Sequence, residues 1–238
     1  MRLSFTTHRR IDAASCGFCS RKTLRLFERR EIWVPTWRGW LLLLAIVLGL
    51  TVGFLAFAYQ FLSVNRPVAA NILAVDGWIP DYALEEAAQE FKEKGYQYLV
   101  AAGGPVPQGD TISGYGNFAR VAGTVLLKLR VPKEKLIEAP AAKTYRDRTF
   151  ESAKAVRAKL NELGISVRGL NVFTEGSHGR RSRMIYRKVF GKETIVGVVT
   201  FRPREYEAER WWKSSAGVEE ITTGTIEWLF ERLFSSGR

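Results

Sequence analysis

A short segment between a predicted strand and a predicted helix carries the side chains best suited to chemistry. Glu175, Ser177 and His178 follow the predicted strand 170–174, and arginines come directly after them. The backbone amides and the macrodipole at a helix start favour an anion such as phosphate, and guanidinium groups bind phosphate through paired hydrogen bonds. Histidine can move protons near neutral pH. We therefore predict a ligand site here. Its catalytic candidates are His178 and Glu175, with Glu175 orienting His178, and its ligand-binding candidates are Ser177, Arg181 and Arg183.

The same segment has a structural interpretation. Serine commonly caps helices, so Ser177 could serve only as the N-cap of the following helix, with the arginines exposed to solvent. His178 is the only histidine outside the first 38 residues. Its place at the carboxyl end of a strand favours the ligand-site interpretation, because ligand crevices in open parallel sheets lie at that edge.

Three other loops are predicted at this edge. Glycines there would let a ligand approach the backbone, while a threonine and a glutamate in the first turn of a helix can bind a ligand or serve only as helix-start residues. The further ligand-binding candidates are Asp76, Gly77, Gly103, Gly104, Thr149 and Glu151.

The sequence lacks the glycine-rich dinucleotide motif, the Walker loop, the nucleophile elbow and the HExxH zinc motif. No cofactor is assigned and no metal site is predicted. Cys16 and Cys19, even with His8, fall short of the four ligands of a closed zinc site. A metal shared across a dimer is the alternative for this cysteine pair.

From Pro67 onward, short apolar runs alternate with amphipathic segments, which is typical of parallel strands joined by crossover helices. We predict an α/β, Rossmann-like doubly wound fold with a mainly parallel five-stranded sheet, helices on both faces and one preceding transmembrane helix. The strands are expected at 71–76, 98–102, 136–138, 170–174 and 194–199. The helices are expected at 82–94 with Asp81 as its cap, at 115–129, at 149–163 and from the Glu175 loop to 190.

A last helix is predicted from apolar residues that recur at helical spacing. We expect this face to pack against the sheet. A helix lying on a membrane is the alternative, supported by the neighbouring Trp211 and Trp212. The residues of the face are Ile226, Leu229, Phe230, Leu233 and Phe234.

The segment from Gly39 to Asn65 contains no charged residue. About 20 apolar residues suffice to cross the hydrocarbon core as a helix, so residues 39–65 are predicted to span a membrane. Tryptophans before it and Tyr59 near its end suit the two interfaces. A cleaved signal peptide is the alternative, since Ala56 and Ala58 give a small-x-small pattern, but the region before it would be unusually long.

The basic charge is concentrated before this helix. Residues 1–38 contain nine Lys/Arg and three Asp/Glu, which is half of the net charge of +12. Positive residues favour the cytoplasmic side, so we predict a cytoplasmic tail at 1–38 and an exported domain at 67–238. The charges of that domain are mixed in sign, so we expect no nucleic acid partner.

Four short motifs carry a family resemblance. The stretch 174–181 resembles the Thr-Ser-x-x-His-x-x-Arg-Ala element of the YdcF-like domain family, which includes SanA- and ElyC-type envelope proteins. Residues 72–77 are similar to its first strand and glycine, 100–104 to its Ser-Gly-Gly strand end, and 149–153 to its Thr-x-Glu-Asn-Ala helix start. Serine at 152 and glutamate at 175 depart from that pattern.

This resemblance implies a Rossmann-like domain behind one anchor in the plasma (inner) membrane, acting in cell-envelope or peptidoglycan-precursor metabolism. With the predicted anion site, it suggests a phosphorylated, possibly lipid-linked ligand gripped by Arg181 and Arg183. The alternative is a non-catalytic anion- or nucleotide-binding scaffold. Under the enzymatic hypothesis, His178→Ala is expected to abolish function without lowering the melting temperature.

Overall fold

The computed structural model describes residues 34–108, 112, 114–144 and 146–234. The chain divides into two units, residues 1–44 and 45–238, and helix α1 (Trp37–Leu62) continues from the first into the second. Most of the predicted cytoplasmic tail, including Cys16 and Cys19, lies outside the described residues.

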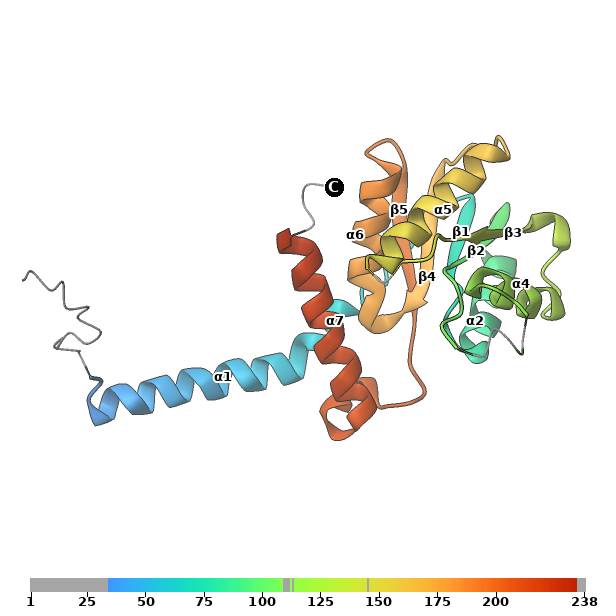
Figure 1. Ribbon diagram of the computed structural model, residues 1–238. Coiled ribbons are helices and arrows are strands. Elements are labelled where there is room, and N and C mark those ends of the chain that lie inside the picture. The colour runs from blue at the N-terminus through green and yellow to red at the C-terminus, as the bar shows by residue number, and fades with distance from the viewer. Residues whose placement is uncertain (1–33, 109–111, 113, 145, 235–238) are drawn as a thin grey trace, which may run out of the picture. The chain divides into compact units, whose positions relative to one another are not determined.

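Five parallel strands form one sheet in the order β3-β2-β1-β4-β5 (Figure 1). All five predicted strands are present, and the sheet is wholly parallel. Their bounds are β1 Ile72–Asp76, β2 Tyr98–Gly103, β3 Leu136–Pro140, β4 Gly169–Glu175 and β5 Ile195–Phe201. All residues of β1 are buried, as expected of a central strand covered on both faces.

Helices cover both faces of the sheet, which confirms the predicted fold class. On one side, α5 (Arg148–Glu162) and α6 (Gly179–Phe190) pack on alternate strand residues such as Ala74. On the other side, α2 (Asp81–Lys94) and α4 (Phe118–Lys128) pack on the residues between them, such as Val75 (Figure 1). Successive side chains of a strand point to opposite faces of the sheet, so one apolar strand contributes to the cores under both helix layers.

Two predicted helix starts were wrong in detail. Pro80 is the residue before α2, and Asp81 is the first residue of the helix rather than its cap. The Pro80 carbonyl accepts hydrogen bonds from the Ala83 and Leu84 amides at 2.9 and 3.1 Å, so the first turn closes on Pro80. The helix expected from 115 begins at Phe118, because the Asn117 side chain accepts a hydrogen bond from the Arg120 amide at 2.9 Å and so caps it.

The linker after α1 attaches to strand β5. Arg66 and Val198 exchange backbone hydrogen bonds of 2.8 and 3.0 Å, and the Asn171 side chain both donates to and accepts from the Val68 backbone at 2.9 Å. At Gly197, an added Cβ would lie 2.1 Å from the Asn171 amide oxygen. The absence of a side chain there lets the linker cover an otherwise open sheet edge.

Helix α1 is 26 residues long, and its only charged residue is Arg38. It is the one helix among the described residues that is long and apolar enough to cross a membrane. Most of its large side chains are exposed, whereas Ala58, Tyr59 and Leu62 near its end are buried against Trp211 and other residues of the second unit. These features fit a single-pass membrane protein whose anchor ends within the domain.

The last helix, α7 (Ser215–Phe234), does not pack as predicted. The apolar face expected against the sheet is exposed, so that prediction was wrong. Helix α7 instead buries Gly217, Ile221, Gly224 and Glu231, and it contacts the short helices η2 (Gly176–His178) and η3 (Ala208–Lys213). Gly217 and Gly224 on this opposite face let the backbone of α7 lie close to the rest of the domain. The spacing of large apolar residues in the sequence did not reveal this.

Candidate functional site

A crevice of about 500 Å³ lies over the carboxyl ends of the strands. Its size is typical of small-molecule sites. Strands β1 and β4 are neighbours at its centre, and the helices that follow them cover opposite faces of the sheet. Their loops diverge there, which is where open parallel sheets bind ligands. Six predicted candidates line this crevice, namely Asp76, Gly103, Gly104, Thr149, His178 and Arg181.

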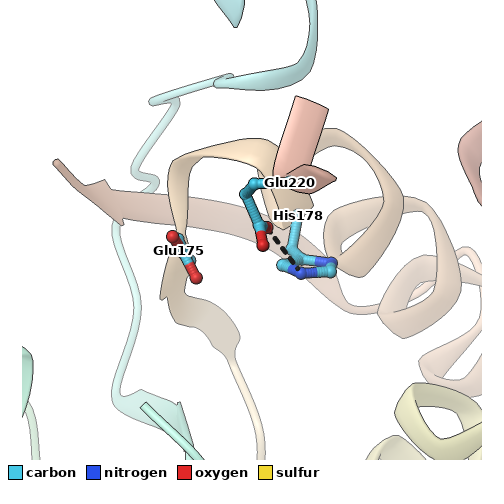
Figure 2. A group of neighbouring side chains, drawn as sticks. All are labelled: Glu175, His178 and Glu220. Atoms are coloured by element: carbon cyan, nitrogen blue, oxygen red, sulfur yellow. Dashed lines mark ion pairs between the residues drawn. The ribbon is translucent and has the colours of Figure 1, made fainter. Parts of the chain in front are cut away.

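His178 lies between two glutamates of α7. Its Nε2 is 3.1 Å from Glu220 Oε1, and its Nδ1 is 3.6 Å from Glu227 Oε2 (Figure 2 shows the Glu220 pair). The ring of Trp78 packs edge-on against the imidazole, with centroids 5.2 Å apart. The imidazole is thus contacted at both nitrogens by carboxylates and by one aromatic ring.

The charges around His178 determine its protonation. Burial by itself lowers the pKa of His178, but the hydrogen bond and charge of Glu220, with the charge of Glu227, outweigh it and raise the pKa above its ordinary value. The hydrogen bond from His178 in turn lowers the pKa of Glu220. His178 therefore stays protonated to higher pH than a free histidine, which suits a proton donor.

Ser177 supports this pair. Its side chain is almost fully buried, and its hydroxyl donates to Glu220 Oε1. It is not among the residues that line the crevice. Ser177 therefore holds Glu220 in place and is not positioned to touch a ligand in the crevice.

Glu175 lies beside the same cluster (Figure 2). Burial and the nearby charge of Glu220 raise its pKa to about 7, although the charge of His178 acts in the opposite direction. Glu175 does not line the crevice, and the glutamates that contact His178 come from α7. One ligand atom each from Glu175, His178 and Glu220 lie within 4.8 Å of one another, so these three residues could hold a divalent cation.

Arg181 and Arg148 both line the crevice, and Arg181 is the one next to His178. Its Nη1 donates to Glu227 Oε2 at 2.8 Å, while its buried Nε has no hydrogen-bond acceptor within the described part of the chain. A buried donor without an acceptor is costly. A phosphate or carboxylate oxygen in the crevice would supply one.

Asp76 ends β1 and is 4% exposed. Burial raises its pKa, whereas the Thr174 hydroxyl and the positive charges of His178 and Arg181 lower it. Its carboxyl group lines the crevice together with both of those cations. The crevice thus combines a carboxyl group, an imidazole and a guanidinium group.

Three other candidates are not in the crevice lining. Gly77 serves close packing, because an added Cβ would lie 2.6 Å from the Phe118 carbonyl oxygen. Glu151 makes an ion pair of 3.1 Å with Lys154. The Arg183 Nε donates to the Val196 carbonyl at 3.0 Å, and Arg183 lines a different groove.

Gly104 differs from Gly77 in the space around it. A Cβ added at Gly104 would meet no atom closer than 3.9 Å, and that atom is the Ala142 carbonyl oxygen. Because Gly104 also lines the crevice, its missing side chain leaves room for a ligand beside the backbone.

Sequence reasoning missed the two glutamates that hold His178. Glu220 and Glu227 are seven residues apart and so lie on one face of α7. That spacing is present in the sequence, but the predicted packing of α7 placed a different face, the apolar one, against the domain.

The sequence matches no model of a known protein family, and no curated protein is similar enough to indicate homology. The resemblance to the YdcF-like domain family therefore stays a prediction from four short motifs.

Proposed function

We propose that this chain is a membrane-anchored protein whose crevice binds a phosphorylated ligand and whose His178 transfers a proton to it. The observation that supports this most directly is the pairing of Arg181, with its unsatisfied buried Nε, and His178, with its raised pKa, in one crevice. Such a pair can bind an anionic group and donate a proton to one of its oxygens.

Each residue has a distinct role in this proposal. Arg181 binds phosphate oxygens, assisted by the amides in the first turn of α5 around Thr149. His178 donates the proton, and Glu220 and Glu227 keep it protonated and fixed in orientation. Gly104 leaves space for the ligand, and Trp78, 42% exposed, lies at the crevice edge.

Arg181→Met tests phosphate binding. The full chain in detergent is screened by thermal shift against inorganic phosphate, nucleotides and short-chain prenyl phosphates. A ligand at about 100 times its Kd should stabilise the wild type by about 2.7 kcal/mol. Since a hydrogen bond to a charged group contributes about 1.5–3 kcal/mol, Arg181→Met should weaken binding by about tenfold to a hundredfold.

Arg168→Met is the matched control, because Arg168 is exposed just before the amino end of β4, away from the crevice. It should leave the ligand-induced shift unchanged. Equal shifts in wild type and Arg181→Met would show that phosphate does not bind through this crevice. Mass spectrometry of the stabilising ligand then separates turnover from binding alone.

Binding without turnover would support the second candidate function, a non-catalytic anion- or nucleotide-binding scaffold. The neutralisation of Arg181 and His178 by α7 glutamates in the unliganded protein favours that candidate. The ligand must compete with Glu227 for Arg181, and a module that only senses an anion can use such a competition.

We further propose that the protein belongs to the YdcF-like family and acts in the cell envelope, on a lipid-linked phosphate outside the plasma membrane. The basic tail before α1 supports this orientation. Alkaline phosphatase fused after Arg238 should be active and a green fluorescent protein fusion at the same point dark. The opposite result would place the domain in the cytoplasm and contradict an extracytoplasmic substrate.

A further inference from the structure

A second cavity, of about 470 Å³, lies on the other side of α6 from the sheet-edge crevice residues and is strongly basic. We call it the basic groove. None of its described lining residues is acidic. Its cations come from the linker, α6, the loop after α6, and α7, and they include Arg66, Arg180, Arg183, Arg187, Lys192 and Arg232.

The protein holds several of these cations in place. Arg180 donates its Nε hydrogen to the Phe61 carbonyl and lies over the Phe61 ring, 4.0 Å from its centroid. Arg183 donates to the Val196 carbonyl at 3.0 Å. Lys188, also in the lining, is paired with Glu231 of α7. Guanidinium groups fixed in this way lose little further freedom when an anion binds.

The cations also repel one another. Burial lowers the pKa of Arg183, and the charges of Arg187, Arg66 and Arg180 lower it further. Burial and the charge of Arg66 likewise lower the pKa of Arg180. An anion in the basic groove would relieve this repulsion, so the electrostatics favour a ligand that carries phosphate.

The basic groove begins where the membrane-spanning helix ends. Val64, two residues beyond α1, lines it, and so does Trp228 of α7. Trp228 packs edge-on against Phe61 in the last turn of α1, with ring centroids 4.8 Å apart. The groove therefore adjoins the carboxyl end of α1, whichever side of the membrane the domain occupies.

Helix α7 exposes an apolar stripe next to the basic groove. The five side chains of this stripe, Ile226, Leu229, Phe230, Leu233 and Phe234, are between 42% and 72% exposed. They lie on the face of α7 opposite Gly217, Ile221 and Gly224, which are buried against the domain. Arg232 and the basic groove lie along one side of this stripe, and the glutamates along its other side, Glu227 and Glu231, are paired with Arg181 and Lys188. An apolar stripe beside a row of cations is typical of a helix that lies in a membrane interface.

We propose that α7 lies on the membrane surface with its apolar stripe in the lipid, and that the basic groove binds the phosphate of an anionic phospholipid headgroup. The occupant is lipid rather than another protein because both surfaces adjoin the end of the anchor and because the groove is complementary in charge to anionic headgroups. The proposal is independent of the ligand in the sheet-edge crevice.

The first test measures which lipids the groove retains. The full chain is placed in nanodiscs of mixed phosphatidylcholine and phosphatidylglycerol, and the lipids that stay bound are identified by native mass spectrometry. Each Lys or Arg near a membrane contributes about 1 kcal/mol toward anionic lipid. Arg187→Glu with Lys192→Glu should therefore reduce the preference for phosphatidylglycerol by about tenfold or more.

Lys133→Glu with Lys135→Glu is the matched control. These residues are exposed before β3, the opposite edge strand of the sheet, and the charge change is the same. This control should keep the wild-type preference. Equal retention of both lipids by the wild type, or an unchanged preference in the groove variant, would overturn the lipid site. If the groove variant does not fold, Arg187→Gln with Lys192→Gln makes the same comparison with a smaller loss.

A second arm separates lipid from free phosphate. In nanodiscs of phosphatidylcholine alone, millimolar inorganic phosphate should not stabilise the wild type relative to the groove variant. Stabilisation that matches the effect of phosphatidylglycerol would show a site for free anions and contradict the lipid assignment.

A separate experiment, photocrosslinking, tests whether the apolar stripe contacts lipid. A photoreactive benzoylphenylalanine at Phe230 should crosslink to lipid in the nanodisc, whereas the same group at Leu163, 48% exposed at the end of α5, should not. Crosslinks from position 230 to a second copy of the chain, with no lipid adduct, would show a protein interface and overturn the membrane-surface position of α7.

Discussion

His178→Gln is expected to reduce turnover of the crevice ligand by about 10²–10⁴-fold, the usual contribution of a positioned general acid or base. The amide can still donate a hydrogen bond to Glu220, whose Oε1 is 3.1 Å from the imidazole Nε2. The variant should therefore fold, with a melting temperature only a few degrees below that of the wild type. Product formation is measured by mass spectrometry on the ligand that stabilises the protein, and function by complementation in cells.

Glu220→Gln distinguishes positioning from proton transfer. The hydrogen bond and charge of Glu220 help to raise the pKa of His178, so removing the charge should move the loss of activity to lower pH and leave KM nearly unchanged. Full turnover or full complementation by His178→Gln would contradict the proton-transfer role. His178→Ala would also leave Glu220 and Glu227 without the charge of His178 beside them. We therefore expect this variant to lose some stability, in contrast to the expectation from the sequence.

Glu175→Gln is expected to raise the melting temperature at pH 8 and to leave it unchanged at pH 4.5. The pKa of Glu175 is about 7 in the folded protein and close to its ordinary value when unfolded. A carboxyl group with a raised folded pKa contributes stability below its unfolded pKa and loses that contribution as the pH rises through the folded pKa. Above pH 7 the ionised wild type is therefore the less stable chain, by on the order of 2 kcal/mol.

The measurement is thermal unfolding of both chains from pH 4.5 to 8 in the presence of a chelator. Glu151→Gln is the control, because Glu151 makes an ion pair near the surface with Lys154 and such pairs contribute at most about 1 kcal/mol. A constant difference between wild type and Glu175→Gln across this range would show that Glu175 is not in a repulsive environment. If added Zn²⁺ or Mn²⁺ made the wild type more stable than Glu175→Gln at pH 8, Glu175, His178 and Glu220 would instead bind a cation.

The comparison of sequence with structure is clearest at the site. The positions of Asp76, Gly103, Gly104, His178 and Arg181 were predictable, because the carboxyl ends of parallel strands share one edge and local patterns mark where strands end. The roles of Ser177, Glu175 and Arg183 were not. Adjacent residues in a short turn and a helix point in different directions, and the direction depends on how the turn is packed.

The membrane-spanning helix and the α/β class were determined by the sequence alone, since hydrophobic length and the alternation of strand and helix patterns are local properties. The strand order, with β1 beside β4, and the position of α7 were decided only by tertiary packing. An apolar face can be buried in protein or in lipid, and its spacing is the same in both. The face of α7 that is buried contains small residues, and Glu220 and Glu227 beside it contact His178, which lies 42 and 49 residues earlier in the chain.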